Sequence, residues 1–198
     1  ETRNIKYKNI ISRIKSSSKN KKYNCIIGVS GGVDSTYVAY LLKNEGLNPL
    51  AVHLDNGWDS ELAVQNIRNT LEKLDIDLVT HVIDWKQFRD LQISFLKAST
   101  PDGEIPSDHA INAILWQTAA KYNVKYIISG MNFSTESMNI PNWAYGHSDW
   151  KYIKSVHKKF GNLKLKNYPY FRISHLVYYT LIKKIKTISI LNYVDYNK

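Results

Sequence analysis

The fold is decided by one stretch near the start of the chain, Tyr23-Asn24-Cys25-Ile26-Ile27-Gly28-Val29-Ser30-Gly31-Gly32-Val33-Asp34-Ser35-Thr36. It begins as an apolar run rich in β-branched residues, which is typical of a buried strand. The run breaks at Ser30-Gly31-Gly32 and resumes as an apolar-rich helix over 37–42. Adjacent glycines at such a turn let the backbone approach a ligand closely, and the first helical amides face it with the positive end of the helix dipole. The stretch therefore predicts a cradle for phosphate groups.

Polar side chains add to this cradle. Ser30 and Ser35 offer hydroxyl donors, whereas Asp34 suits a polyphosphate only if it positions a metal ion or a donor group. The alternative is an ordinary strand-turn-helix in which Ser and Asp cap the helix. The order Ser-Gly-Gly-Val-Asp-Ser is more specific than a bare Gly-Gly pair, and it is neither a Walker A loop nor a dinucleotide fingerprint.

Outward from this stretch, apolar strands alternate with helical patterns. We expect strands over 49–55, 77–84 and 124–130, and helices over 60–74, 85–98 and 108–122. This alternation predicts a Rossmann-like α/β fold with a parallel sheet and helices on both faces. A chain reversal after the third strand would place the first and fourth strands side by side, where ligands bind at the carboxyl ends. We divide the chain into an N-terminal helical extension, a nucleotide-binding domain and a C-terminal helical segment, over 1–22, 23–150 and 151–198.

Composition narrows the class of protein. The length of 198 residues suits one domain, and 43% hydrophobic residues are enough for a core. No run is long enough to cross a membrane, and no secretory signal is visible, so we expect no membrane partner. The single cysteine, Cys25, fits a reducing cytoplasm, and the histidines lack metal-ligand spacing, so we predict no protein-bound transition metal. The net charge of +10 suits a polyanionic partner or simply a lysine-rich surface.

The Ser-Gly-Gly-Val-Asp-Ser stretch resembles the signature loop of the PP-loop (N-type) ATP pyrophosphatases, whose fold is of the adenine nucleotide alpha hydrolase type. The resemblance implies that ATP adenylates a substrate oxygen, that Mg²⁺ bridges the phosphates, and that AMP and pyrophosphate are released. It also implies a set of ATP-binding residues. The residues expected around the pyrophosphate loop are Gly28, Val29, Ser30, Gly31, Gly32, Asp34 and Ser35. Those expected near adenosine are Leu54 and Asp55, and Gly130 is expected near the α-phosphate.

Within that class, the stretches 51–58, 101–110, 127–132 and 148–153 resemble the N-acetyl sugar amidotransferases of bacterial lipopolysaccharide O-antigen biosynthesis. This resemblance implies conversion of an N-acetyl group on a nucleotide-linked sugar into an acetamidino group. It also implies that a separate glutaminase subunit supplies ammonia and that nucleic acid is not a partner. It is compatible with a homodimer. Two features depart from the family: the sequence lacks its cysteine-bearing segment, and Met131 stands where relatives often have histidine.

The catalytic residues that we predict on this basis are Asp34, Asp108, His109, Glu136 and Asp149. Asp108 and His109 would open a helix and face the sugar or the ammonia, with His109 as proton acceptor. The alternative for this pair is a helix N-terminal acid beside a structural histidine.

Two other functions remain open at this point. A tRNA-modifying PP-loop enzyme of lysidine synthetase or thiolase type would suit the basic charge and predicts salt-dependent tRNA binding. Sulfur-transfer members usually carry further cysteines, which Cys25 alone does not supply. A non-catalytic nucleotide-binding module related to universal stress proteins is the third reading, and the retention of Asp34 and both serines argues against it.

Overall fold

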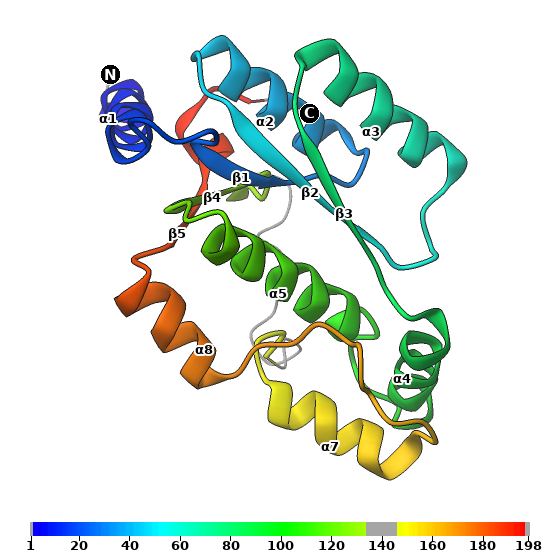
Figure 1. Ribbon diagram of the computed structural model, residues 1–198. Helices are drawn as coiled ribbons and strands as arrows, with labels where there is room; N and C mark the ends of the chain where they lie inside the picture. Colours follow the sequence, from blue (N-terminus) through cyan, green and yellow to red (C-terminus); the bar gives the residue numbers. More distant parts are fainter. Residues whose placement is uncertain (1, 134–145, 197–198) are drawn as a thin grey trace.

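The computed structural model describes residues 2–133 and 146–196, and its centre is a five-stranded sheet in the order β3-β2-β1-β4-β5 (Figure 1). Every neighbouring pair of strands is parallel. The strands are β1 (Cys25–Gly28), β2 (Pro49–Asp55), β3 (Leu78–Val82), β4 (Tyr126–Ser129) and β5 (Lys186–Ser189). The predicted parallel α/β fold is confirmed, as is the pairing of the first strand with the fourth.

Helices cover both faces of this sheet. They are α1 (Thr2–Ser17), α2 (Val33–Asn44), α3 (Glu61–Leu74), α4 (Trp85–Lys97), α5 (Ile105–Lys121), α7 (Trp150–Phe160), α8 (Ile173–Val177), the π-helix η1 (Tyr178–Ile182) and the 3₁₀-helix η2 (Ile190–Tyr193). In Figure 1, α1, α2 and α3 lie above the sheet, and α4, α5, α7 and α8 lie below it. No helix in the described parts of the chain combines the length and the hydropathy that a bilayer crossing needs.

Two separate cores form because successive strand residues point to opposite faces. On one face, Ile26 and Ile127 join side chains from α4, α5 and α7. On the other face, Ile27 and Ile128 join side chains from α1, α2 and α3. All four isoleucines are at most 2% exposed, so the central strands β1 and β4 are covered on both sides.

The C-terminal segment differs from the prediction. We expected a C-terminal helical segment over 151–198, but the run of α8 and η1 ends at Ile182 and the chain then forms β5, which pairs in parallel with β4. Lys184 takes a positive φ of 55°, which breaks the helix, and the β-branched residues Thr187 and Ile188 continue as a strand. The described part of this segment is therefore not helical throughout, because Lys186–Ser189 supply an edge strand of the central sheet.

Candidate nucleotide site

The loop between β1 and α2 has a backbone that requires glycine. Gly31 has a φ of +74°, and a Cβ atom there would lie 2.4 Å from the carbonyl oxygen of Ala63 at the start of α3. The loop is held in place because the Nδ2 of Asn66 donates a hydrogen bond to the carbonyl oxygen of Gly31 (3.3 Å). The loop and α3 are thus fitted against each other, and any larger residue at position 31 would force them apart.

The start of α2 is left open toward a ligand. Ser60, Asp84 and Asp149 cap α3, α4 and α7 with their side chains, whereas Gly32, which precedes α2, has no side chain with which to do so. The first amides of a helix have no acceptor within it, and together with the helix dipole they favour an anion. The Oγ of Ser35 is folded back into the turn, where it donates to the carbonyl oxygen of Gly32 (3.0 Å).

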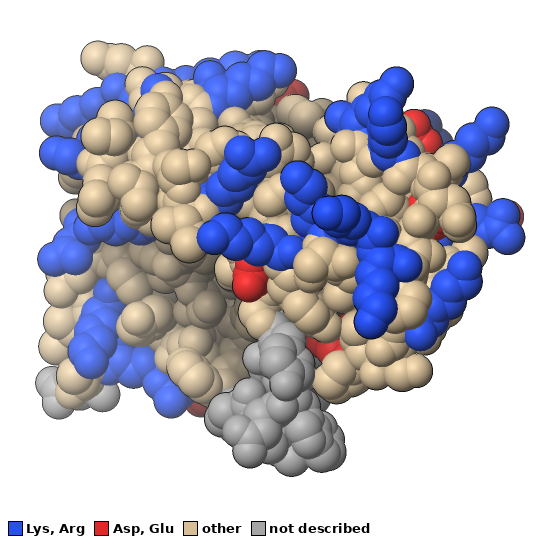
Figure 2. Space-filling model, turned by 90° about the horizontal axis from the view of Figure 1, so that it is seen from below, with Lys and Arg blue, Asp and Glu red and all other residues tan. Residues whose placement is uncertain are grey.

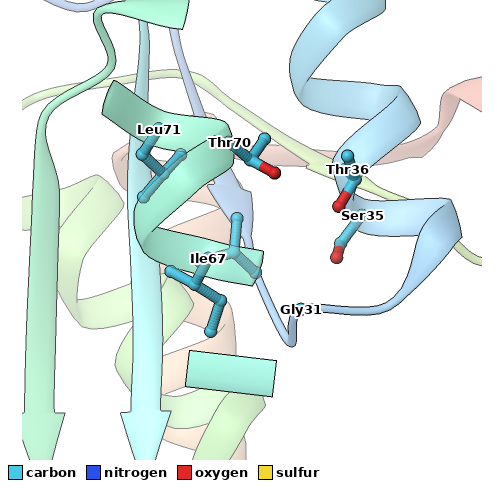
Figure 3. A pocket seen from close by; sticks show the side chains of 7 residues that line it. Gly31, Ser35, Thr36, Ile67, Thr70 and Leu71 are labelled. Atoms are coloured by element: carbon cyan, nitrogen blue, oxygen red, sulfur yellow. The ribbon is translucent and has the colours of Figure 1, made fainter. Parts of the chain in front are cut away.

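Two hollows adjoin this loop. The smaller, about 10 Å³, lies between α2 and α3, where the side chains of Thr36 and Thr70 face each other (Figure 3). The larger is a groove of about 590 Å³ between the same helices, and it is also reached at Gly31. Its wall includes Tyr37, Tyr40 and Lys73. The groove is large enough for a small ligand, so the loop is accessible from the surface.

Asp34 has a partner from the far end of the chain. The hydroxyl of Tyr196 donates a hydrogen bond to Asp34 Oδ1, and its ring stacks on Tyr37 with 5.0 Å between centroids. This hydrogen bond, with burial, raises the pKa of Tyr196 to about 12. A Cβ at Gly130 would lie 3.4 Å from the backbone carbon of Asp34. The structure therefore brings Gly130 and Asp34 together, as expected, and adds Tyr196, which carries no sequence signal for this position.

The end of β2 supplies the expected neighbours of adenosine. Leu54 is buried, and Asp55 Oδ1 accepts a hydrogen bond from the backbone N–H of Gly57 (3.1 Å). His53, on the same strand, is a buried residue that we did not predict. Its Nδ1 donates to the carbonyl oxygen of Val29 (3.0 Å), and its Nε2 lies 3.4 Å from Asp59 Oδ2. This histidine joins the ends of β1 and β2 just before the glycine loop.

The contacts of His109 argue against its predicted role as a proton acceptor. The ring is fully buried, its Nδ1 donates to the carbonyl oxygen of His147 (2.8 Å), and its Nε2 accepts from the backbone N–H of Phe171 (3.3 Å). It also stacks on the ring of Phe171 at 4.3 Å. Burial lowers the pKa of His109 more than the bond to His147 raises it. Both nitrogens are occupied, so the structural alternative for this histidine has the better support.

The other predicted acids fall into three situations. Asp108 lies 3.5 Å from Nε2 of His147, which itself lies 3.0 Å from Asp102. Burial raises the pKa of Asp108, while the charge of His147 opposes this. Asp149 caps α7 by accepting from the backbone N–H groups of Lys151 (2.8 Å) and Tyr152 (3.1 Å), so its carboxylate has a structural task. Glu136 lies outside the described residues.

Metal-binding groups are sparse in this arrangement. Within residues 2–133 and 146–196, no group of three or more His, Cys, Asp or Glu side chains is placed to hold a metal ion. Mg²⁺ needs less, because it is commonly held by one or two carboxylates together with substrate phosphates. Asp34, in the first turn of α2 beside the glycine loop, is the carboxylate for which we predicted such a role.

Comparison with known proteins supports the reading of the loop. Residues 23–100 match the family model of the tRNA methyl transferase HUP domain. A tRNA-specific 2-thiouridylase of Fusobacterium nucleatum is 30% identical over 158 residues, which are 75% of this chain and 42% of that protein. A tRNA(Ile)-lysidine synthase of Chlamydia felis is 45% identical over 42 residues, or 21% of this chain and 13% of that protein. The chain thus spans less than half the length of these curated relatives.

Among solved structures, an NH3-dependent NAD synthetase from Campylobacter jejuni superposes with a TM-score of 0.51 at 17% identity, covering 77% of this chain and 71% of that one. At this identity the likeness concerns the fold alone. The O-antigen amidotransferase resemblance is not shown by these comparisons and stays a prediction. Residues 23–100 are thus similar to the HUP domain of the tRNA methyl transferase family, and the solved structure adds a likeness of the parallel α/β fold.

Proposed function

We propose that this protein uses ATP to activate a carbonyl oxygen on a tRNA base, so that a nitrogen nucleophile can then replace that oxygen. The observation that carries the ATP-dependent step is the uncapped start of α2 behind the constrained Gly31 turn. The choice of tRNA is supported by the relatives, whose names state that they act on tRNA. This reading replaces the acetamido sugar as the better supported substrate class.

The proposed reaction follows from the chemistry of the carbonyl group. An amide-like carbonyl is a poor electrophile because its oxygen is a poor leaving group. Attack of that oxygen on the α-phosphorus of ATP forms an O–P bond and breaks the bond to pyrophosphate. The nitrogen nucleophile then adds to the activated carbon, loses a proton, and expels AMP together with the original oxygen.

The residues of the loop would contribute electrostatics rather than covalent chemistry. The first amides of α2 would donate hydrogen bonds to the departing pyrophosphate as its charge grows. Mg²⁺, held by Asp34 and the phosphates, would neutralise further charge. The hydrogen bond from Tyr196 would fix the orientation of the Asp34 carboxylate.

Sulfur transfer by this chain has less support than nitrogen transfer. A cysteine that carries sulfur must be accessible and must reach the thiolate form. Cys25 is the single cysteine of the sequence, it is fully buried in β1, and burial raises its pKa to about 12. It therefore offers no usable thiolate.

The same observation favours one second candidate, the conversion of an acetamido sugar with ammonia from a partner glutaminase. That reaction also needs a nitrogen nucleophile and no cysteine in this chain. It rests on the sequence resemblance of 51–58, 101–110, 127–132 and 148–153.

AMP formation tests both candidates. The protein is incubated with ATP, Mg²⁺ and ammonium as the nitrogen nucleophile, together with either unfractionated tRNA or nucleotide-linked acetamido sugars, and the products are analysed by mass spectrometry. We expect AMP with tRNA, and a loss of at least about 100-fold in Asp34→Ala, which removes a charged group at the transferring phosphates. Asp195→Ala, which removes an exposed carboxylate next to Tyr196 in the chain, is the matched control. AMP with the sugar alone would favour the second candidate, and full activity of Asp34→Ala would refute the site.

A further inference from the structure

The net charge of the chain resides entirely in one segment. The sequence has 27 Lys and Arg against 17 Asp and Glu, which gives +10. Residues 150–194 contain ten Lys and Arg and no acidic residue at all. The rest of the chain holds seventeen basic and seventeen acidic residues and is neutral. Because the charge is segregated in this way, it is not explained by a generally lysine-rich surface.

Six exposed lysines of this segment form what we call the basic face: Lys151, Lys154, Lys158 and Lys159 of α7, and Lys164 and Lys166 of the following loop. On a helix with 3.6 residues per turn, the four lysines of α7 fall within an arc of roughly 140°. The opposite side of α7 carries its buried residues, Ile153, Val156 and His157. Seen from below, the molecule presents many Lys and Arg side chains and few acidic ones (Figure 2).

The loop after α7, which carries Lys164 and Lys166, is anchored to α4. The carboxylate of Asp90 in α4 accepts hydrogen bonds from the backbone N–H groups of Asn162 and Leu163, each 2.9 Å long, and from His157. Burial opposes ionisation of Asp90, but these bonds outweigh it and hold its pKa at about 2. The Asp90 carboxylate is thus occupied by its hydrogen bonds to the loop. Because its side chain is only 12% exposed, it does little to neutralise the exposed lysines of the basic face.

The placement of Lys151 is unfavourable for the helix itself. Lys151 lies in the first turn of α7, where the helix dipole disfavours positive charge, and Lys154 follows in the next turn. Within the described residues, neither lysine forms an ion pair with an acidic side chain. Folding does not explain these charges, so a ligand with negative charge is the simpler explanation.

The composition of the basic face favours a nucleic acid over a protein as its partner. Protein interfaces have an apolar core from which charged residues are depleted. Helix α7, all of which is described, exposes no large hydrophobic side chain. The nearest exposed large hydrophobic residue along the sequence is Leu163. A row of lysines without an apolar centre is the pattern that contacts phosphates, which bind mainly through charge.

The basic face is also connected to the start of α5, at the carboxyl edge of the sheet. His147, three residues before α7, lies 3.5 Å from Asp108, and its carbonyl oxygen accepts from His109 (2.8 Å). In a parallel α/β sheet a crossover helix begins at the edge where the strands end, so α5 begins on the side of the glycine loop. A polymer lying along α7 would therefore lead toward the nucleotide site.

We infer that the basic face binds the phosphate backbone of an RNA, and does so without reading base sequence. The identification of that RNA as a substrate rests on the function proposed above, but the binding surface itself rests on charge and geometry. The lysines would place the RNA, and a base that reaches the carboxyl edge would react there.

Binding of fluorescently labelled, unfractionated tRNA, measured without ATP between 50 and 200 mM salt, tests this inference. The test variant carries Lys151→Gln, Lys154→Gln and Lys158→Gln. We expect its affinity to fall at least about tenfold, and the slope of log K against log salt to become shallower by about 2 to 3, because about one unit is lost per phosphate contact. The control variant carries Lys6→Gln, Lys8→Gln and Lys15→Gln on α1, which removes the same charge from exposed positions elsewhere; it should bind like the parent chain.

Three results would overturn the inference: no tRNA binding by the parent chain, equal weakening in both triple variants, or displacement of tRNA by polyglutamate at equal charge concentration. The last result would assign the face to an acidic protein instead. Failure of the proposed function looks different. If tRNA binds through the basic face but AMP forms only with acetamido sugars, the inference about RNA binding holds and the proposed reaction on tRNA is wrong.

Discussion

Two regions differ in how their polar groups are used: the glycine turn that leads into α2, and the surroundings of His109 in α5. At the start of α2, Gly31 and Gly32 provide no side chain, and the helix has no side-chain cap. At the start of α5, His109 is buried, and both of its ring nitrogens are in hydrogen bonds to distant segments. The start of α5 also lacks a side-chain cap, so the difference lies in the side chains: the glycine turn offers none, whereas both ring nitrogens of the buried His109 already have partners.

This difference separates residues that bind from residues that hold the fold. His109 lies among the rings of Phe171, Trp150 and Tyr168, with centroids 4.3 to 6.3 Å away. The hydroxyl of Tyr168 donates to the carbonyl oxygen of Pro106 (2.7 Å), which ties the segment after α7 to the start of α5. A histidine in such a cluster stabilises the protein. An open helix start behind a glycine turn is suited to a ligand.

The largest effect is expected at Gly31. A Cβ there would meet the carbonyl oxygen of Ala63 at 2.4 Å, and a φ of +74° is unfavourable for alanine. Gly31→Ala must therefore displace either the loop or the start of α3. We expect ATP-dependent AMP formation to fall at least about 100-fold, since a misplacement of about 1 Å has effects of that size.

Gly46→Ala is the matched control for this experiment. Gly46 has a similar φ of +71°, but no atom lies within 4 Å of its hypothetical Cβ. It should lose only about 1 kcal/mol of stability and keep its activity. If Gly31→Ala remains as active as Gly46→Ala, the loop does not bind the phosphates and the contrast between the two regions disappears.

The next largest effect is expected at His109, and it should be an effect on stability. His109→Phe keeps the stacking but leaves the carbonyl oxygen of His147 and the N–H of Phe171 without their partner. Unsatisfied buried groups cost about 1 to 3 kcal/mol each, so we expect a loss of about 3 kcal/mol in urea unfolding. AMP formation per folded molecule should stay within a few-fold. His175→Phe is the control, because Nδ1 of His175 is buried without a hydrogen-bond partner among the described residues.

The pH dependence of stability sharpens the same test. Because the pKa of His109 is lowered by burial, the unfolded chain binds its proton first as the pH falls. The stabilisation by neutral His109 is complete above the ordinary histidine pKa of about 6.5 and declines below it. The parent chain should therefore lose more stability between pH 7 and pH 5 than His109→Phe does. A bell-shaped activity profile that vanishes in His109→Phe without a change in stability would instead make His109 catalytic.

Much of the fold could be predicted because its signals are local. The strands β1, β2, β3 and β4 are apolar runs bounded by turn residues, and their alternation with helices dictates a parallel sheet. The strand β5 was missed because Lys186-Thr187-Ile188-Ser189 continues the apolar spacing of the preceding helix. Its strand conformation comes from pairing with β4, some 60 positions earlier in the chain, which no local pattern encodes.

In the candidate site, too, local features could be predicted and contacts between distant segments could not. The glycine loop could be predicted because its backbone conformation depends on adjacent residues. The hydrogen bond from Tyr196 to Asp34 joins positions 162 residues apart, and the burial of His109 depends on segments 38 and 62 residues away. Asp149 is a different case: an Asp just before a helix is a capping signal, and that local reading is the one that its contacts support.

The smallest effect is expected at Asp149. Asp149→Ala removes the acceptor for the backbone N–H groups of Lys151 and Tyr152 and should lower stability by about 1 kcal/mol. Asp149→Ser keeps a capping oxygen and should restore most of that loss, although serine lacks a carboxylate. AMP formation and tRNA binding should be unchanged in both variants. If activity falls in Asp149→Ala, and Asp149→Ser restores stability but not turnover, the carboxylate takes part in the reaction. The start of α7 would then belong to the ligand-binding region and not to the structural one.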